Sequence, residues 1–88
     1  MSGPLEAVSP IPVPTGWRFV LEDDMPTIER DVGSFTLTVG LDDGKWRWWL
    51  CPRGRDGATN HGVGADMVDA IWQVFDALAR RIAGRITR

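Results

Sequence analysis

The chain has few of the residues on which covalent catalysis and metal binding depend. Its 88 residues include one cysteine, Cys51, and one histidine, His61, and serine occurs only at positions 2, 9 and 34. Cys51, Asp56 and His61 have no recognised metal-ligand spacing, and no nucleophile stands beside an obvious base. No phosphate-binding glycine loop is present. We therefore expect a protein that is not an enzyme and uses no metal or cofactor.

Long apolar runs are also absent, which bears on where the protein acts. No stretch approaches the roughly 18–20 apolar residues that cross a bilayer, and the N-terminus lacks the basic and apolar regions of a secretory signal. A single cysteine cannot form an intramolecular disulfide. We expect a cytoplasmic protein that does not contact a membrane.

Tyrosine is missing too, yet five tryptophans and three phenylalanines are present in a chain that is 43% hydrophobic and 25% charged. This composition is typical of a packed domain, whose core depends here on a few large rings. Four prolines fall within residues 1–16, which predicts a flexible, proline-rich N-terminal arm. Residues 17–88 are then expected to form a single domain.

Alternation of apolar and polar residues predicts three strands. The first begins at Trp17, and the proline-containing segment 23–33 that follows it is expected to be a loop. Residues 34–51 predict a β-hairpin around the turn Asp43-Gly44, a favoured type I′ pair. A two-residue turn places Val39 opposite Trp48 and keeps the large apolar residues on one face. Arg47 and Trp49 then point to the other face.

The C-terminal region predicts one amphipathic helix of about 18 residues. Asp66 is suited to cap its N-terminus, Asp69 stands at the capping-box position, and the helix is expected to end near Gly84. The apolar positions recur every three or four residues and are assigned to the core: Val68, Ile71, Trp72, Phe75, Leu78, Ala79 and Ile82. Residues 58–61 are a candidate fourth strand.

These elements predict an α+β fold in which a three- or four-stranded antiparallel β-meander carries one C-terminal helix on one face. Trp17, Trp46, Trp48 and Trp72 are expected in the core, which leaves Trp49 on the open face of the sheet. The element order and the helix-entry pattern Gly64-x-Asp66-x-x-Asp69-Ala70 resemble the β-β-β-α modules of the HicB antitoxin type over residues 34–83. The resemblance implies this helix-on-sheet arrangement and carries no function to the chain.

Charge divides the chain more sharply than the net charge of −2 suggests. Residues 1–44 hold eight acids and two bases, whereas residues 45–88 hold four acids and eight bases. The acids concentrate at Glu22, Asp23, Asp24, Glu29 and Asp31, and the bases at Arg47, Arg53, Arg55 and the end of the helix. Both groups are candidates for contact with a charged partner.

Three hypotheses about function follow. The first is a small non-enzymatic protein-binding module, an adaptor or inhibitor, whose open sheet face binds another protein or a second copy of the chain. Its site residues are Trp49, Arg47, Arg53 and Arg55, because tryptophan and arginine are enriched at binding hot spots.

The second hypothesis is a nucleic-acid-binding domain in which the same residues serve, with Trp49 stacking on a base and the arginines meeting phosphates. The third gives the acidic patch Asp23, Asp24, Glu29 and Asp31 the role of a phosphate mimic, as in a phage-encoded inhibitor of a host defence protein or a bacterial accessory protein. The sequence leaves the three open.

Overall fold

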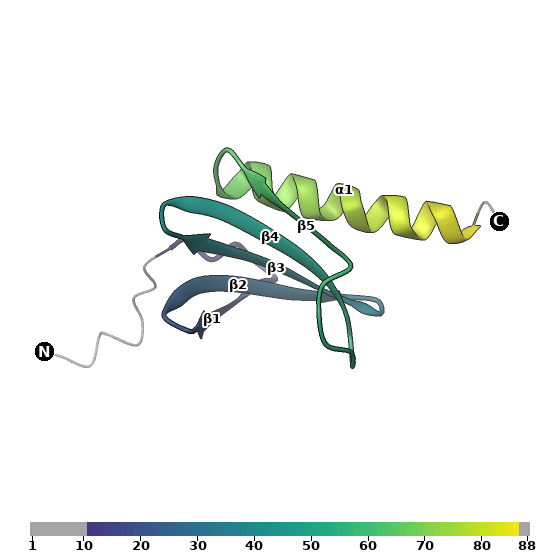
Figure 1. The fold of residues 1–88 in the computed structure, drawn as a ribbon, viewed down its shortest axis with the longest axis horizontal. Coiled ribbons are helices and arrows are strands. Elements are labelled where there is room, and N and C mark those ends of the chain that lie inside the picture. Colours follow the sequence, from purple (N-terminus) through teal and green to yellow (C-terminus); the bar gives the residue numbers. More distant parts are fainter. Residues whose placement is uncertain (1–10, 87–88) are drawn as a thin grey trace, which may run out of the picture.

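Five antiparallel strands and one helix make up the computed structural model of the protein, which describes residues 11–86 (Figure 1). The helix lies across one face of the sheet, as the α+β prediction requires, but the sheet has five strands rather than three or four. The strands lie in chain order from one edge of the sheet to the other. The elements are β1 (Arg18–Glu22), β2 (Met25–Val32), β3 (Phe35–Asp42), β4 (Lys45–Pro52), β5 (Asn60–Gly64) and α1 (Met67–Ile86).

The additional strand is β2, in the segment expected to be a loop. A two-residue turn, Asp23-Asp24, connects it to β1, and both aspartates have positive φ, at 50° and 65°. Aspartate is one of the few residues that tolerate this left-handed region, so the turn forms without glycine. The loop prediction was wrong because Arg30 occupies an inward-facing position of β2, which obscures the alternation. Its guanidinium lies 5.9 Å from the centre of the Phe75 ring.

The β3–β4 hairpin follows the predicted register. Asp43 and Gly44 both have positive φ, as a type I′ turn needs, and Val39 pairs with Trp48 across the strands. The opposite face carries Thr38 against Trp49. Turns fall at residues 23–24, 33–34 and 43–44, so the meander reverses every ten residues.

Strand β5 begins at Asn60 rather than at residue 58, and its glycines are packing positions rather than turn glycines. A Cβ atom on Gly62 would lie 2.7 Å from the Trp48 ring, and one on Gly64 would lie 2.5 Å from the backbone nitrogen of Ala70. Both contacts are shorter than a side chain allows. Glycine therefore lets β5 approach the helix and the central tryptophan closely.

Helix α1 begins as the sequence predicts. The Asp66 carboxylate accepts a hydrogen bond of 2.8 Å from the backbone N–H of Asp69. In return, the Asp69 carboxylate accepts one of 2.7 Å from the N–H of Ala65, which closes a capping box shifted by one residue. The helix continues to Ile86. No helix within residues 11–86 is long and apolar enough to cross a membrane.

The helix face that meets the sheet agrees only in part with the one expected: of the predicted core positions, Leu78 is buried and Ile71 and Phe75 pack against the core. Its buried residues are Ala70, Val74, Ala77 and Leu78, which pack against Leu37, Val39, Trp48 and Leu50 of the sheet in one core cluster. Val68, Trp72 and Ile82 are exposed instead. The prediction that Trp72 belongs to the core was therefore wrong, whereas Trp48 is buried and Trp17 and Trp46 pack against the core.

Helix α1 packs over β3, β4 and β5 and leaves β1 and β2 without a helix above them. Part of the predicted N-terminal arm packs against this core: Ile11 is 4% exposed. Trp17 meets Phe75 of the helix edge-on, with ring centroids 6.2 Å apart. Residues 1–10 of the predicted arm lie outside the described residues.

Candidate binding surface

The face of the sheet opposite α1, here called the open face, carries every second residue of each strand. Trp49 occupies its middle, between Thr38 of β3 and His61 of β5. The two-residue turn between β2 and β3 places Glu29 of β2 opposite Thr38 on its other side. Trp49, the one large ring of this face, therefore lies in line with Glu29 of β2, with Thr38 of β3 between them.

A hollow of about 580 Å³ opens on this face around Trp49. Its apolar lining comes from Trp49, Met25, Cys51 and Ala58. Its rim is acidic, and the carboxylates come from β1, from the turn that follows it, from β2 and from the end of β3: Glu22, Asp23, Glu29 and Asp42. The hollow thus combines an aromatic ring with a negatively charged edge.

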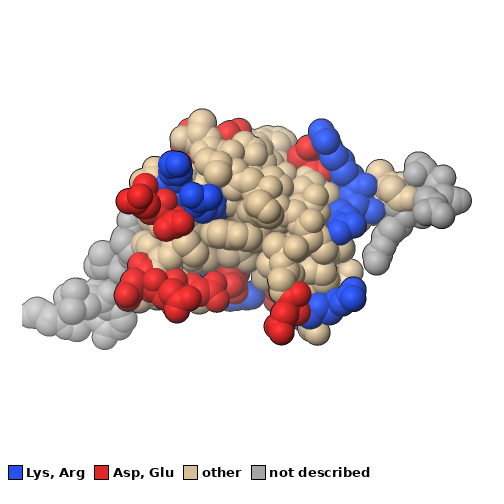
Figure 2. All heavy atoms as spheres, viewed as in Figure 1, with Lys and Arg blue, Asp and Glu red and all other residues tan. Residues whose placement is uncertain are grey.

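The acids of this region gather over the strands without a helix above them. Figure 2 shows a row of acidic side chains along the part of the molecule that holds β1 and β2, while basic side chains lie toward the C-terminal end of α1. The carboxylates of Glu22 and Asp23 make no ion pair or hydrogen bond with any side chain among residues 11–84. They are therefore free to meet an external cation.

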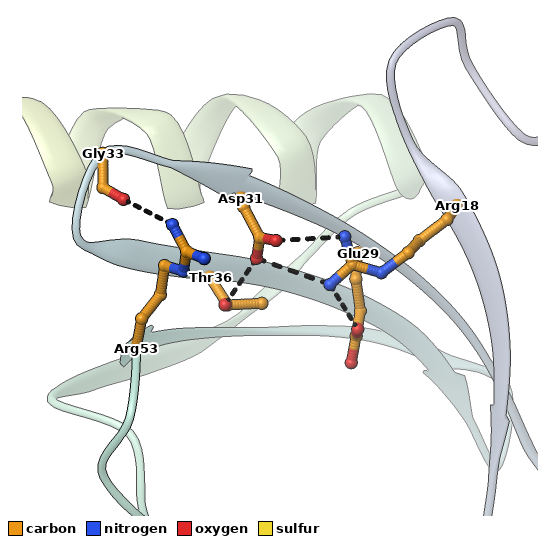
Figure 3. Close-up of polar contacts among 6 residues, drawn as sticks. All are labelled: Arg18, Glu29, Asp31, Gly33, Thr36 and Arg53. Atoms are coloured by element: carbon orange, nitrogen blue, oxygen red, sulfur yellow. Dashed lines mark hydrogen bonds and ion pairs between the residues drawn. The ribbon is translucent and has the colours of Figure 1, made fainter.

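Other carboxylates of the open face are already paired. Arg18 lies between two acids of β2, with its guanidinium 3.0 Å from Glu29 and 3.3 Å from Asp31 (Figure 3). The hydroxyl of Thr36 donates a hydrogen bond of 2.7 Å to Asp31 from the other side. This network links β1, β2 and β3 across the open face.

The network changes the acidity of its members. The hydrogen bond from Thr36, followed by the bond from Arg18, lowers the pKa of Asp31 below its ordinary value. Bonding to Asp31 in turn raises the pKa of Arg18 above its ordinary value. Asp31 therefore keeps its negative charge in mildly acidic solution.

The predicted arginines do not surround Trp49. Arg47 forms an ion pair of 3.1 Å with Asp42 at the end of the hairpin. Arg53 donates a hydrogen bond of 3.2 Å to the backbone carbonyl of Gly33 (Figure 3). Arg53 and Arg55 line a separate hollow of about 340 Å³ together with Arg81 of the helix. Gly57 and Ala58 of the same loop line the Trp49 hollow instead.

Cys51 lies in the Trp49 hollow but is a poor nucleophile. Burial raises the pKa of its thiol, and the charges of Glu29 and Glu22 raise it further. The thiol is therefore protonated near neutral pH, and it makes no hydrogen bond with His61 or Asp56. Among residues 11–86, no three His, Cys, Asp or Glu side chains lie close enough together to hold a metal ion.

The structure thus groups the predicted site residues differently from the sequence-based hypotheses. Trp49 is joined by Asp23 and Glu29 of the acidic patch, while Asp24 completes the turn and Asp31 belongs to the Arg18 network. Sequence reasoning missed Met25 and Asp42 as neighbours of Trp49. The alternation of Met25, Thr27, Glu29 and Asp31 in β2 was the signal that could have revealed them.

Comparison with known proteins finds no matching family model, no matching curated protein and no matching solved structure.

Proposed function

We propose that the chain is a non-enzymatic protein-binding module whose open face receives an arginine or lysine side chain of a partner protein in the Trp49 hollow. The observation that carries the proposal is the hollow itself. It sets an aromatic ring among carboxylates that come from three strands and a turn. Tryptophan is the aromatic residue that attracts a cation best, and nearby carboxylates add to that attraction.

The charges around Trp49 favour a basic partner over a nucleic acid. Glu22 and Asp23 have no cation of their own among residues 11–84, and the pKa of Cys51 is raised by burial and then by the negative charges of Glu29 and Glu22. Phosphates would be repelled there, and Arg53 and Arg55 lie at a different hollow. The protein-binding hypothesis and the acidic-patch hypothesis therefore come together in one surface. A basic segment of the partner is the chemistry that fits it.

A synthetic peptide of alternating arginine and glycine, labelled with a fluorophore, provides a direct probe. We expect fluorescence anisotropy to show binding that weakens as salt is added, because exposed charges are screened. Trp49→Ala should weaken binding by about tenfold or more, as expected for a hot-spot ring. Glu22→Gln should weaken it by a smaller factor, because it removes one carboxylate of the rim.

Trp72→Ala is the matched control, since Trp72 is an exposed tryptophan on the other side of the molecule. It should leave peptide binding unchanged, and an aspartate-glycine peptide should not bind. Equal losses for Trp49→Ala and Trp72→Ala, or stronger binding to a labelled single-stranded oligonucleotide than to the basic peptide, would contradict the proposal.

A further inference from the structure

A basic hollow lies between the loop that follows β4 and the second half of α1, and it shares no lining residue with the Trp49 hollow. Its volume is about 340 Å³, and Arg53, Arg55 and Arg81 all line it. It is here called the arginine hollow. Among the described residues, no aspartate or glutamate lines it. Three positive side chains therefore meet at one place without an acid between them.

Two of these arginines have no partner in the described part of the chain. The side chains of Arg55 and Arg81 make no ion pair or hydrogen bond with residues 11–84. Arg53 is less free, because it donates a hydrogen bond to the carbonyl of Gly33 and lies within electrostatic reach of Asp31 (Figure 3). Like charges gathered in this way repel one another, so an external anion would be attracted to the hollow.

The loop that carries Arg53 and Arg55 is fixed at both ends by backbone hydrogen bonds. The N–H of Arg53 donates a bond of 2.8 Å to the carbonyl of Ser34, and the N–H of Thr59 donates one of 2.8 Å to the carbonyl of Leu50. Arg81 comes from the helix on the other side. Because the backbone positions are set in advance, binding an anion would cost little more than the ordering of the side chains.

From these observations we infer that the arginine hollow binds the phosphate group of a small phosphorylated molecule. A phosphate monoester carries a charge of about −1.5 to −2 at neutral pH and has three strong acceptor oxygens. A planar guanidinium group bonds such an anion through two N–H groups at once. The hydroxyl of Ser34 also lines the hollow and makes no hydrogen bond with residues 11–84, so it adds a further donor.

The surface beside the arginine hollow indicates what carries the phosphate. A second hollow, of about 730 Å³, shares Thr59 and Arg81 with it and is lined by the polar side chains of Asn60 and Asp76. These groups suit the hydroxyls of a sugar. A nucleic-acid backbone instead needs a row of cations along its successive phosphates. Here the arginines converge on one hollow, and the carboxylate of Asp76 would repel the next phosphate.

Nuclear magnetic resonance of the arginine Nε–Hε groups in the full chain tests the inference directly. On titration with ribose 5-phosphate we expect the signals of Arg55 and Arg81 to shift and to reach saturation. Sodium chloride of equal ionic strength should not reproduce these shifts. Inorganic phosphate should bind about tenfold more weakly, because it lacks the sugar. Acetate should not bind, because it carries a single charge.

Variants assign the binding to the hollow, with inorganic phosphate as the probe because it needs only the arginines. Arg55→Gln and Arg81→Gln should each weaken its binding by about tenfold or more. Arg80→Gln is the matched control, since Arg80 is adjacent on the same helix but pairs with Asp76 and does not line the arginine hollow. It should change binding by less than about twofold. Circular dichroism should show that all three variants keep the fold.

Several outcomes would overturn the inference. Equal shifts in sodium chloride and phosphate, or equal losses in Arg80→Gln and Arg81→Gln, would show a general response to ionic strength or charge. Ribose 5-phosphate that binds no better than inorganic phosphate would remove the sugar from the inference. A phosphoserine peptide or a single-stranded oligonucleotide that binds the hollow more tightly than ribose 5-phosphate would assign it to a phosphoprotein or a nucleic acid. Trp49→Ala should leave phosphate binding unchanged, so this inference and the proposed function fail separately.

Discussion

The two ends of the sheet are stabilised by different interactions. At the end formed by β4, β5 and α1, packing is so close that Gly62 and Gly64 have no room for a side chain, and Trp48 donates a hydrogen bond of 2.9 Å to Gln73 of the helix. At the end formed by β1 and β2 no helix covers the strands, Leu21 is exposed, and the contacts between strands include ion pairs of Arg18. One end is stabilised by packing and the other in part by surface charge.

This difference shows where a small protein can change its surface without losing its fold. Close packing around Gly64 leaves no room for an added atom, so substitutions at the covered end are constrained by the fit between β5 and α1. Exposed ion pairs contribute little to the free energy of unfolding, so the charged side chains of β1 and β2 can be exchanged at little cost. The candidate binding hollow takes most of its acidic rim from that tolerant end.

Gly64→Ala should produce the largest effect on stability, because it disturbs the covered end directly. The new Cβ atom would lie 2.5 Å from the nitrogen of Ala70, so strand or helix must shift. We expect the free energy of unfolding to fall by about 3 kcal/mol, the upper range for overpacking, as measured by urea denaturation. Gly84→Ala is the control, since a Cβ there meets no atom within 4 Å. It should raise stability by about 0.5–1 kcal/mol.

Gln73→Ala should have an intermediate effect at the same end. It leaves the indole N–H of Trp48 without its acceptor in a ring that is 8% exposed. We expect the free energy of unfolding to fall by about 1–2 kcal/mol. Asp76→Ala removes a carboxylate one turn away that pairs with exposed Arg80, and should change stability by less than about 0.5 kcal/mol. Similar losses of unfolding free energy in Gln73→Ala and Asp76→Ala would contradict the distinction between buried contacts and surface charge.

Thr36→Val should have the smallest effect on stability but a clear effect on acidity at the uncovered end. The pKa of Asp31 is depressed in the folded chain, so its contribution to stability is present above about pH 4 and is lost as the pH falls through the folded pKa. Removing the Thr36 hydroxyl should raise that pKa toward its ordinary value. A carboxyl-carbon NMR titration measures it directly.

Arg18→Ala serves as the comparison in the same titration. It should also raise the pKa of Asp31, because it removes both the hydrogen bond and the charge by which Arg18 lowers that pKa. An Asp31 pKa unaffected by Thr36→Val would show that Arg18 alone sets it.

The sequence predicted those parts of the fold in which local chemistry and pattern agree. Asp43-Gly44 is a strong turn signal and the flanking apolar residues match in pairs, so the β3–β4 register follows from the order of residues alone. Strand β2 was missed because Asp23-Asp24 is an unusual turn and Arg30 faces inward, where its charge lies over the Phe75 ring. Local pattern does not report such a tertiary contact.

The orientation of the helix could not be predicted for a different reason. Apolar residues occur on two faces of α1, and periodicity alone does not say which of them meets the sheet. Gly64 favours the observed face, because a glycine there lets the backbone at Ala70 pack closely against β5. Trp72 then points outward. The surroundings of Trp49 were predicted only in part. Its face followed from the hairpin, while its acidic neighbours depended on the unrecognised β2.

The regular reversal of the meander has a consequence for how the chain folds. Every strand pairs with the next strand in the sequence, so the sheet can grow one hairpin at a time with little loop entropy lost at each step. Such low contact order is associated with fast folding. The edge-on contact between Trp17 and Phe75 is not local in this sense, because it joins the residue before β1 to the helix. We expect it to form after the folding transition state, so that weakening it speeds unfolding rather than slowing folding.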